Sequence, residues 1–357
     1  MKYLLMILFS LNAFADRYVV YDYPVSVESA RMMRKFGFKE MKHFSAYTVD
    51  LSKDQADEFL KRGYKLELDV KVKALGVRSK KISANDQQNE TWGYNAIDAG
   101  LINKKPNGSG EDIVVCVVDT GVDYEHPDLD GQVVGGYAIV KTSTIGKLDY
   151  YDDMGHGTHV SGTIAGLGKQ VLGVASKSKI YAVKVLDQNG DGYFSDVADG
   201  MLACIGKSKV INMSLGGSDP STLMEDALKK VKIAGMHISC AAGNEYGPVG
   251  YPAVYKECIA VSAVNKDMKI ADFSNRGIEI DFAAPGVGIK STVPNGGYEE
   301  WDGTSMAAPH VAGTMSIMLS RNKKKVKGKN INLPQEEQGF GMVNAYKTGK
   351  RFFLWQN

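Results

Sequence analysis

Short apolar runs that alternate with longer helical stretches constrain the fold of this chain most. The runs are rich in β-branched residues and cover 113–118, 180–185, 210–213, 237–241 and 259–264. A continuous apolar run is typical of a strand that is covered on both faces. Helical stretches such as 197–205 and 220–234 separate these strands. The pattern predicts a sheet of buried strands that alternate with helices.

A smaller module precedes this sheet. The pattern between residues 16 and 84 predicts strands at 17–23, 46–51 and 65–72 and helices at 27–36 and 53–62. Ser52 is a capping residue for the second helix. This succession predicts a small α+β unit of the ferredoxin-like type.

One serine lies where a nucleophile would be favoured. Ser305 follows a glycine turn, and Ala307, Val311 and Met315 recur after it at helical spacing. The free N–H groups at a helix N-terminus favour developing negative charge. Ser305 could equally cap the helix, so the interpretation depends on a base and an acid elsewhere.

Asp119 and His156 are the candidates for that acid and base. Asp119 ends a buried apolar run, at the strand tip where open α/β sheets bind ligands; the alternative is a plain turn residue. His156 lies among small residues three positions before His159. A zinc helix would need a spacing of four and a glutamate where Gly157 stands, so we interpret His159 as a buried structural residue.

The chain order Asp119, His156, Ser305 and the local contexts resemble those of the subtilase family. The matching motifs are Val-Asp-Thr-Gly at 118–121, Gly-His-Gly-Thr-His at 155–159, Ala-Ala-Gly-Asn at 241–244 and Gly-Thr-Ser-Met-Ala at 303–307. The resemblance extends from about residue 92 to residue 346.

The resemblance implies a secreted serine endopeptidase that is made as a zymogen. Ser305 would be the nucleophile, His156 the general base, Asp119 the residue that orients it, and Asn244 an oxyanion-hole donor. The resemblance also implies that residues 85–357 form the catalytic domain, an α/β fold with a mainly parallel sheet flanked by helices. Residues 16–84 would form an inhibitory propeptide; the alternative is a permanent accessory domain. The polar stretch from Arg78 to Glu90 would be the linker that is cut.

Two segments resemble the strands with which the family binds extended peptides. The expected substrate-binding residues are Gly190, Asp191, Gly192, Ser214, Leu215, Gly216 and Gly250. Both segments could also be ordinary turns. Small residues predict a deep pocket for a large apolar side chain before the scissile bond, with Glu245 at its rim able to admit a basic one. We also expect Asp191 to favour basic residues upstream; Phe194 is either a subsite wall or a core aromatic.

We expect no cofactor and no metal. The stretch 187–192 imitates the start of an EF-hand loop, but Ala198 stands where the final glutamate belongs. The family's usual calcium site also looks degraded, because the loop 167–170 is short and contains a lysine, although Asp128 resembles one of the ligands.

The termini and the composition limit location and partners. Residues 1–15 resemble a signal peptide that ends in Ala-Phe-Ala, which predicts export, either secretion or a periplasmic location. A net charge of +2 over 357 residues implies no polyanionic partner. We expect a monomer without nucleic acid or a stable membrane anchor, acting on proteins or peptides. The four cysteines are either buried thiols or one of three possible pairings.

Two rival functions stay open to test. A catalytically inactive relative would bind peptides without cutting them, although all four chemical positions are intact. An esterase of the α/β-hydrolase class would need a second glycine where Ala307 stands and a different order of the three residues.

Overall fold

The computed structural model describes residues 15–22, 26–82 and 89–350. Contacts divide the chain into two units, one ending at Val70 and the other beginning at Lys71. The expected signal peptide lies, except for Ala15, outside the described residues. Within the described part, no helix is both long and apolar enough to cross a membrane.

The N-terminal unit is a four-stranded antiparallel sheet with two helices. Its elements are β1 (Asp16–Asp22), α1 (Val27–Phe36), β2 (Lys39–Glu40), β3 (Tyr47–Leu51), α2 (Lys53–Lys61) and β4 (Lys65–Leu68). The strand order β2-β3-β1-β4 is that of the ferredoxin-like fold predicted from the sequence. Ser52 forms the capping box at the start of α2, and Phe59 lies in the core between α2 and the sheet.

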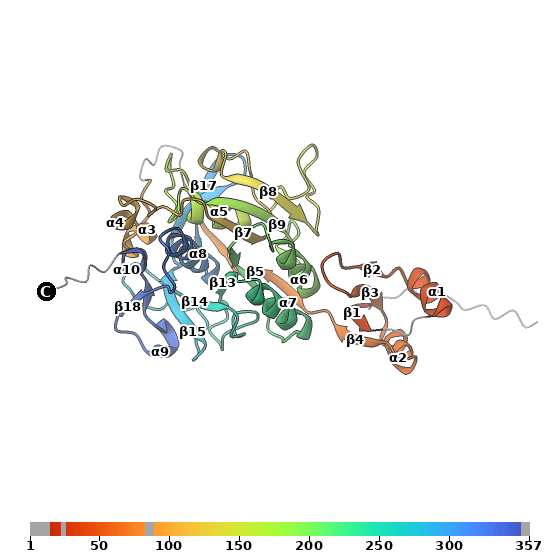
Figure 1. Ribbon diagram of the computed structural model, residues 1–357. Helices are drawn as coiled ribbons and strands as arrows, with labels where there is room; N and C mark the ends of the chain where they lie inside the picture. Colours follow the sequence, from red (N-terminus) through yellow and green to blue (C-terminus); the bar gives the residue numbers. More distant parts are fainter. Residues whose placement is uncertain (1–14, 23–25, 83–88, 351–357) are drawn as a thin grey trace, which may run out of the picture. The chain divides into compact units, whose positions relative to one another are not determined.

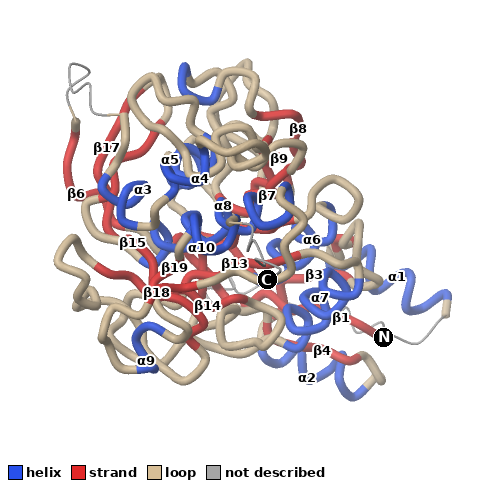
Figure 2. The backbone as a smooth tube through the Cα atoms, turned by 60° about the vertical axis from the view of Figure 1, so that its left-hand side comes forward, coloured by secondary structure: helices blue, strands red, loops and turns tan. Residues whose placement is uncertain are grey.

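The C-terminal unit is built around a nine-stranded sheet, in the order β18-β19-β15-β14-β13-β11-β7-β9-β8 (Figures 1 and 2). Its strands are β7 (Val114–Asp119), β8 (Val133–Ala138), β9 (Lys179–Lys184), β11 (Val210–Met213), β13 (His237–Ala241), β14 (Ile259–Val264), β15 (Ile280–Pro285), β18 (Gly328–Lys329) and β19 (Met342–Val343). Every neighbouring pair is parallel except β18 with β19. The predicted α/β class with a mainly parallel sheet is confirmed.

Helices cover the central strands, which are buried along almost their whole length. The helical elements are α3 (Trp92–Ala96), α4 (Ala99–Asn103), η1 (Pro127–Leu129), α5 (His156–Ala165), α6 (Phe194–Ala203), α7 (Thr222–Ile233), α8 (Thr304–Ser320), α9 (Gln335–Gln338) and α10 (Ala345–Gly349). Helix α5 packs with α8, and α6 packs with α7.

Two three-stranded sheets complete the unit, and each contains a strand from the segment that follows the N-terminal unit. The first has the order β10-β5-β12 and consists of β10 (Asp191–Tyr193), β5 (Lys71–Ala74) and β12 (Leu215–Gly216); the second has the order β16-β17-β6 and consists of β16 (Ile289–Val293), β17 (Gly297–Asp302) and β6 (Val77–Lys81).

The strands on either side of the boundary between the two units differ from the sequence prediction. A single strand at 65–72 was expected, but β4 ends at Leu68 and β5 begins at Lys71. The expected linker from Arg78 includes the end of a strand, since β6 runs to Lys81. Strands β5 and β6 pair with strands that are far away in the sequence. Local periodicity therefore carries no signal for them.

Two disulfides resolve the pairing that the sequence left open. Cys116 of β7 is bonded to Cys204, which follows α6. Cys240 of β13 is bonded to Cys258. Both bonds fix strands that lead into candidate site residues, since β7 ends at Asp119 and β13 ends three residues before Asn244.

Candidate active site

The first turn of α8 holds Ser305 in a fixed place. Pro309 has no N–H to donate to the carbonyl of Ser305 four residues earlier. The hydroxyl of Ser214 donates to that carbonyl instead, at 2.9 Å. Ser214 follows β11 directly, so this hydrogen bond connects the start of α8 to the C-terminal end of a central strand.

Asp119 and His156 form a buried pair. Asp119 is the last residue of β7 and His156 the first of α5. Asp119 Oδ1 lies 2.8 Å from His156 Nδ1 and accepts a 2.7 Å bond from the N–H of Thr120. Gly157 is required for this approach, because a Cβ there would overlap the carbonyl oxygen of Gly121.

Asp152 holds the N-terminus of α5 and was not singled out in the sequence. Its fully buried carboxylate accepts bonds from the N–H groups of Gly155 and Thr158 and from the hydroxyls of Thr158 and Thr120. Burial raises the pKa of Asp152 even though these bonds lower it. The carboxylate complements the helix dipole and so fixes the position of His156.

The hydroxyl of Ser305 does not contact the imidazole of His156 in this structure. It donates to the carbonyl of Ser214 at 2.7 Å. Within the described residues, His156 Nε2 has no hydrogen-bond partner. The imidazole lies beside Gly76 instead, since a Cβ on that glycine would be 3.0 Å from Nε2. The sequence-predicted acid and base are therefore paired, while the third member would need a rotation of its hydroxyl to join them.

Two donors converge on the carbonyl oxygen of Leu75. Asn244 Nδ2 donates to it at 2.7 Å and the N–H of Ser305 at 3.3 Å. The amide of Asn244 is oriented by Thr304, whose N–H and hydroxyl donate to its Oδ1 at 3.0 and 2.8 Å. Gly303 has a φ of 153° and no room for a Cβ, which would collide with the Leu75 carbonyl.

Strand β5 places Leu75 there by lying between β10 and β12. Lys73 is the register partner of Asp191 on one side and Gly216 on the other. The N–H of Ala74 donates to the carbonyl of Gly190, and that of Leu75 to the carbonyl of Ser214. All the expected cleft residues at 190–192 and 214–216 thus lie along one extended segment of the chain.

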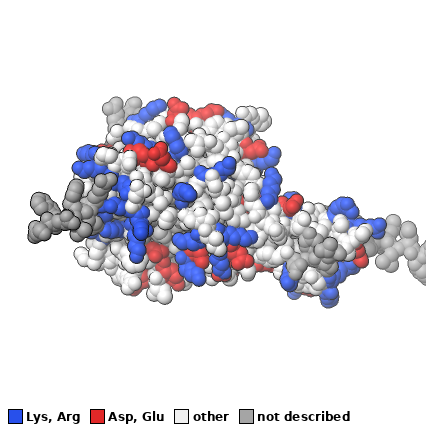
Figure 3. Space-filling view, viewed as in Figure 1, with Lys and Arg blue, Asp and Glu red and all other residues white. Residues whose placement is uncertain are grey.

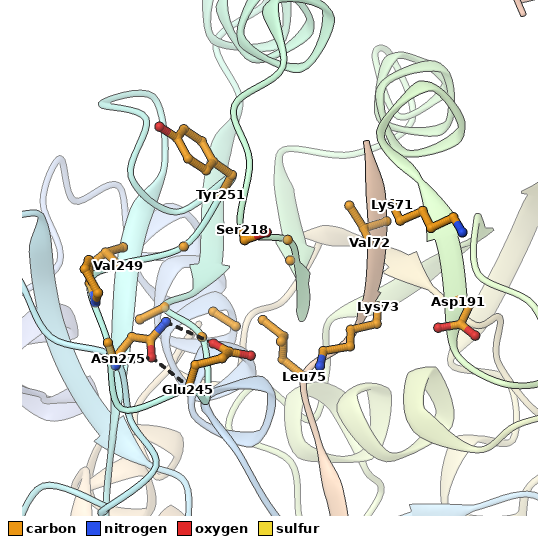
Figure 4. Close-up of a pocket in the computed structure, with 18 residues that line it drawn as sticks. Lys71, Val72, Lys73, Leu75, Asp191, Ser218, Glu245, Val249, Tyr251 and Asn275 are labelled. Atoms are coloured by element: carbon orange, nitrogen blue, oxygen red, sulfur yellow. Dashed lines mark hydrogen bonds between the residues drawn. The ribbon is translucent and has the colours of Figure 1, made fainter. Parts of the chain in front are cut away.

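A cavity of about 540 Å³ opens beside this segment (Figure 4). Leu75 points into it and is 5% exposed. The wall includes Gly216, Ala241, Gly243, Gly250, Tyr251 and Asn275. A Cβ on Gly216 would lie 3.0 Å from Leu75 Cδ1, so the absence of a side chain there makes room for the leucine. Asn275 holds Glu245 at the rim through a 3.1 Å hydrogen bond.

The remaining predictions about the cleft concern Phe194, the turn at Asp187 and the exposed Asp191. Phe194 is fully buried at the start of α6 and is a core aromatic. Asp187 accepts the N–H groups of Asn189 and Asp191 through Oδ1, as in a tight turn. Asp191 itself is exposed, and Figure 4 shows it on the same side of β5 as Lys71.

The residues present do not fit the family's usual calcium site. Asp128 Oδ1 accepts the N–H of Lys169, and Oδ2 accepts the N–H groups of Gln170 and Val171 and the hydroxyl of Tyr298. Four donors therefore surround both oxygens of the one matching ligand. Among the described residues, no three His, Cys, Asp or Glu side chains are grouped to hold a metal ion.

A chelator should consequently leave thermal stability nearly unchanged. We expect the midpoint of unfolding of the Ser305→Ala chain, which avoids self-digestion, to move by less than about 2 °C in excess EDTA. A calcium ion at 100 times its dissociation constant would contribute about 2.7 kcal/mol, or roughly 5 °C. A downward shift of that size would contradict the assignment.

Buried histidines should make the fold sensitive to mild acid. Burial lowers the pKa of His159 to about 3 and that of His310 to about 4. Below about pH 6.5 the unfolded chain binds a proton on each imidazole, whereas the folded chain does not, so stability falls as pH falls. The expected loss is roughly 1.4 kcal/mol per pH unit for each histidine.

Urea unfolding of the Ser305→Ala chain between pH 7.5 and 5.5 measures this loss. His310→Gln removes one of the described histidines whose pKa burial lowers, the others being His126, His159 and His237, and should make the dependence on pH shallower. Equal stability at both ends of this range would contradict the prediction.

The sequence profile of the Subtilase family matches residues 110–338. Subtilisin of Bacillus pumilus is 44% identical over 243 residues, which is 66% of this chain and 86% of that protein. Subtilisin E of Bacillus subtilis is 43% identical over 243 residues, 66% of this chain and 62% of its own length. Alkaline elastase YaB of a Bacillus strain is 37% identical over 293 residues, 78% of this chain and 75% of that protein.

Proposed function

The chain belongs to the subtilase family of subtilisin-like serine endopeptidases, and from that premise we propose that it is an exported enzyme made as a self-inhibited precursor. Its catalytic residues would be Asp119, His156 and Ser305, with Asn244 as oxyanion donor. The precursor would cut itself between Leu75 and Gly76.

One observation carries this proposal: the carbonyl oxygen of Leu75 accepts bonds from both Asn244 and the N–H of Ser305. Those are the two donors that an acyl-transfer enzyme aims at a developing oxyanion. Leu75 directly follows β5, which is bonded on both edges as an added substrate strand would be. These contacts support an enzyme that holds a segment of its own chain as a bound substrate.

The chemistry would proceed by an acyl-enzyme. Rotation of the Ser305 side chain would bring its hydroxyl from the Ser214 carbonyl to His156 Nε2. His156 would take the proton as the oxygen attacks the Leu75 carbonyl carbon, and then give it to the departing amine of Gly76. Asp119 would stay ionised and stabilise the imidazolium. Water would then release the acyl group from Ser305.

This cut places the end of the propeptide earlier than the limit of 84 expected from the sequence. The unit 16–70, together with β5, would act as the inhibitor, because β5 fills the binding cleft until it leaves. The sequence could not supply this position, since nothing in the residue types around Leu75 distinguishes a bond that is cut from one that is not.

Leu75 also supports the expected preference for a large apolar residue before the scissile bond. Its side chain points into a cavity whose opposite wall consists mostly of small residues. Lys71 and Lys73 support a second preference, for basic residues upstream, since Asp191 and Glu245 line the same cavity. Figure 3 shows acidic and basic side chains interspersed on the face in view, which supports peptide substrates over a polyanionic partner.

Export accords with the two disulfides, since such bonds persist in oxidising compartments. The predicted signal sequence, the monomeric state and the choice between secretion and a periplasmic location remain parts of the proposal.

The test is to identify the processed N-terminus and the cleavage specificity together. N-terminal sequencing of the purified active protein should give Gly-Val-Arg, and a fluorophosphonate should label Ser305. A peptide library should be cut after large apolar residues, with an upstream basic preference that weakens in Asp191→Ala. Absence of labelling and hydrolysis would support the inactive peptide-binding relative, and another N-terminus would contradict the assigned bond.

A further inference from the structure

The segment that follows Leu75 is also bound as a strand. Strand β6 pairs antiparallel with β17, and Trp301 is the register partner of Arg78. Figure 2 shows β6 beside β17 at the edge of that small sheet. If Leu75 precedes the scissile bond, Arg78 is the third residue after it.

The Arg78 side chain contacts a buried acidic group and an aromatic ring. Its Nε lies 2.7 Å from Glu299 Oε2, and its Cζ lies 5.6 Å from the centre of the Trp301 ring. The Glu299 side chain is 8% exposed. Trp301 Nε1 donates to the same Glu299 oxygen at 2.9 Å, so the carboxylate and the ring are fixed relative to each other.

Nothing in the catalytic chemistry requires a carboxylate at this place. Neighbouring acidic groups are already compensated: Asp153 pairs with Lys184 at 2.7 Å, and Asp152 accepts five hydrogen bonds from α5 and from residues before it. Among the described residues, Arg78 forms the one ion pair of Glu299. A buried carboxylate without a cation is costly, so departure of Arg78 leaves a site that favours another cation.

The chemistry of the site also favours a guanidinium over an ammonium group. A cavity of about 290 Å³ is lined by Arg78, Glu299, Met154 and Pro294, among others. A guanidinium can bond the carboxylate and face an aromatic ring at the same time, whereas an ammonium is a strongly hydrated point charge.

We propose that Glu299 and Trp301 form a binding site for an arginine side chain three residues after the scissile bond of polypeptide substrates. This inference rests on the proposed function, because it takes Leu75–Gly76 as the bond that is cut. The substrate backbone would add to the edge of β17 as β6 does. Glu299 would then determine specificity on the side of the leaving amine.

The test uses quenched-fluorescent peptides that copy residues 71–79, with arginine, citrulline, lysine or glutamine in place of Arg78. Citrulline keeps the shape of arginine and lacks the charge. With the processed wild-type enzyme, kcat/KM for the arginine peptide should exceed that for the citrulline and glutamine peptides by about tenfold, the worth of one charge-assisted contact at a half-exposed site. The lysine peptide should lie between them.

Glu299→Gln should reduce the preference for arginine over citrulline, measured as the ratio of the two kcat/KM values on the same enzyme, to about twofold or less. Glu300→Gln, a change at the adjacent position of β17, serves as the matched control and should keep the preference. If Glu299→Gln does not fold, the wild-type ratio of arginine to citrulline, and its decrease with added salt, still decide the matter.

The outcomes separate the two proposals. Equal cleavage of the arginine and citrulline peptides between leucine and glycine would overturn the arginine site and leave the proposed function intact. A preference unchanged in Glu299→Gln would also overturn it. If no peptide is cleaved, both proposals fail.

Discussion

Replacement of Ser305 by alanine should leave the precursor uncut and reduce peptide hydrolysis to the background rate. The reason is geometric: the N–H of Ser305 donates to the Leu75 carbonyl, so the Ser305 side chain starts next to the bond that would be cut. The expected loss is about 10⁶-fold in kcat, a value measured on a subtilisin rather than derived from this structure.

Intact mass and N-terminal sequence measure the result directly. Wild type should begin at Gly76, and Ser305→Ala should keep the bond from Leu75 to Gly76. Ser316→Ala is the matched control, because Ser316 lies on the same helix and its hydroxyl only bonds the carbonyl of Ala312. Correct processing of the Ser305→Ala chain in a purified preparation would contradict self-cleavage.

The parts of this molecule that the sequence predicted are those with a local signature. A central strand such as 114–118 is apolar on both faces, so its residue types reveal it without knowledge of its neighbours. Asp119 and His156 were identifiable for a similar reason, because each lies at the end of an element with a recognisable boundary.

The parts that escaped prediction depend on a distant partner. Strand β6 is polar and charged, and it is a strand because β17 binds it. The roles of Thr304 and Asp152 depend on which side chains fold against them, and the pairing of Cys116 with Cys204 could not be chosen among three possibilities. The spacing of residues along the sequence also does not indicate how the Ser305 hydroxyl is oriented.

Replacement of Asn244 by alanine should impair kcat and change KM little. Its Nδ2 lies 2.7 Å from the Leu75 carbonyl oxygen, and this bond would strengthen as that oxygen becomes an anion. Because Thr304 already holds the amide in place, the donor needs no reorganisation during the reaction. The expected decrease is about 10²–10³-fold, the range measured for such a donor in a subtilisin.

The distribution of the effect between kcat and KM decides whether Asn244 acts on the transition state. Steady-state rates on the peptide that copies residues 71–79 give both constants for each variant. Asn265→Ala, which removes an amide from a surface turn, should keep wild-type values. If Asn244→Ala raised KM tenfold at an unchanged kcat, the amide would bind ground state and transition state equally. The backbone N–H of Ser305, at the longer distance of 3.3 Å, would then be the donor on which oxyanion stabilisation depends.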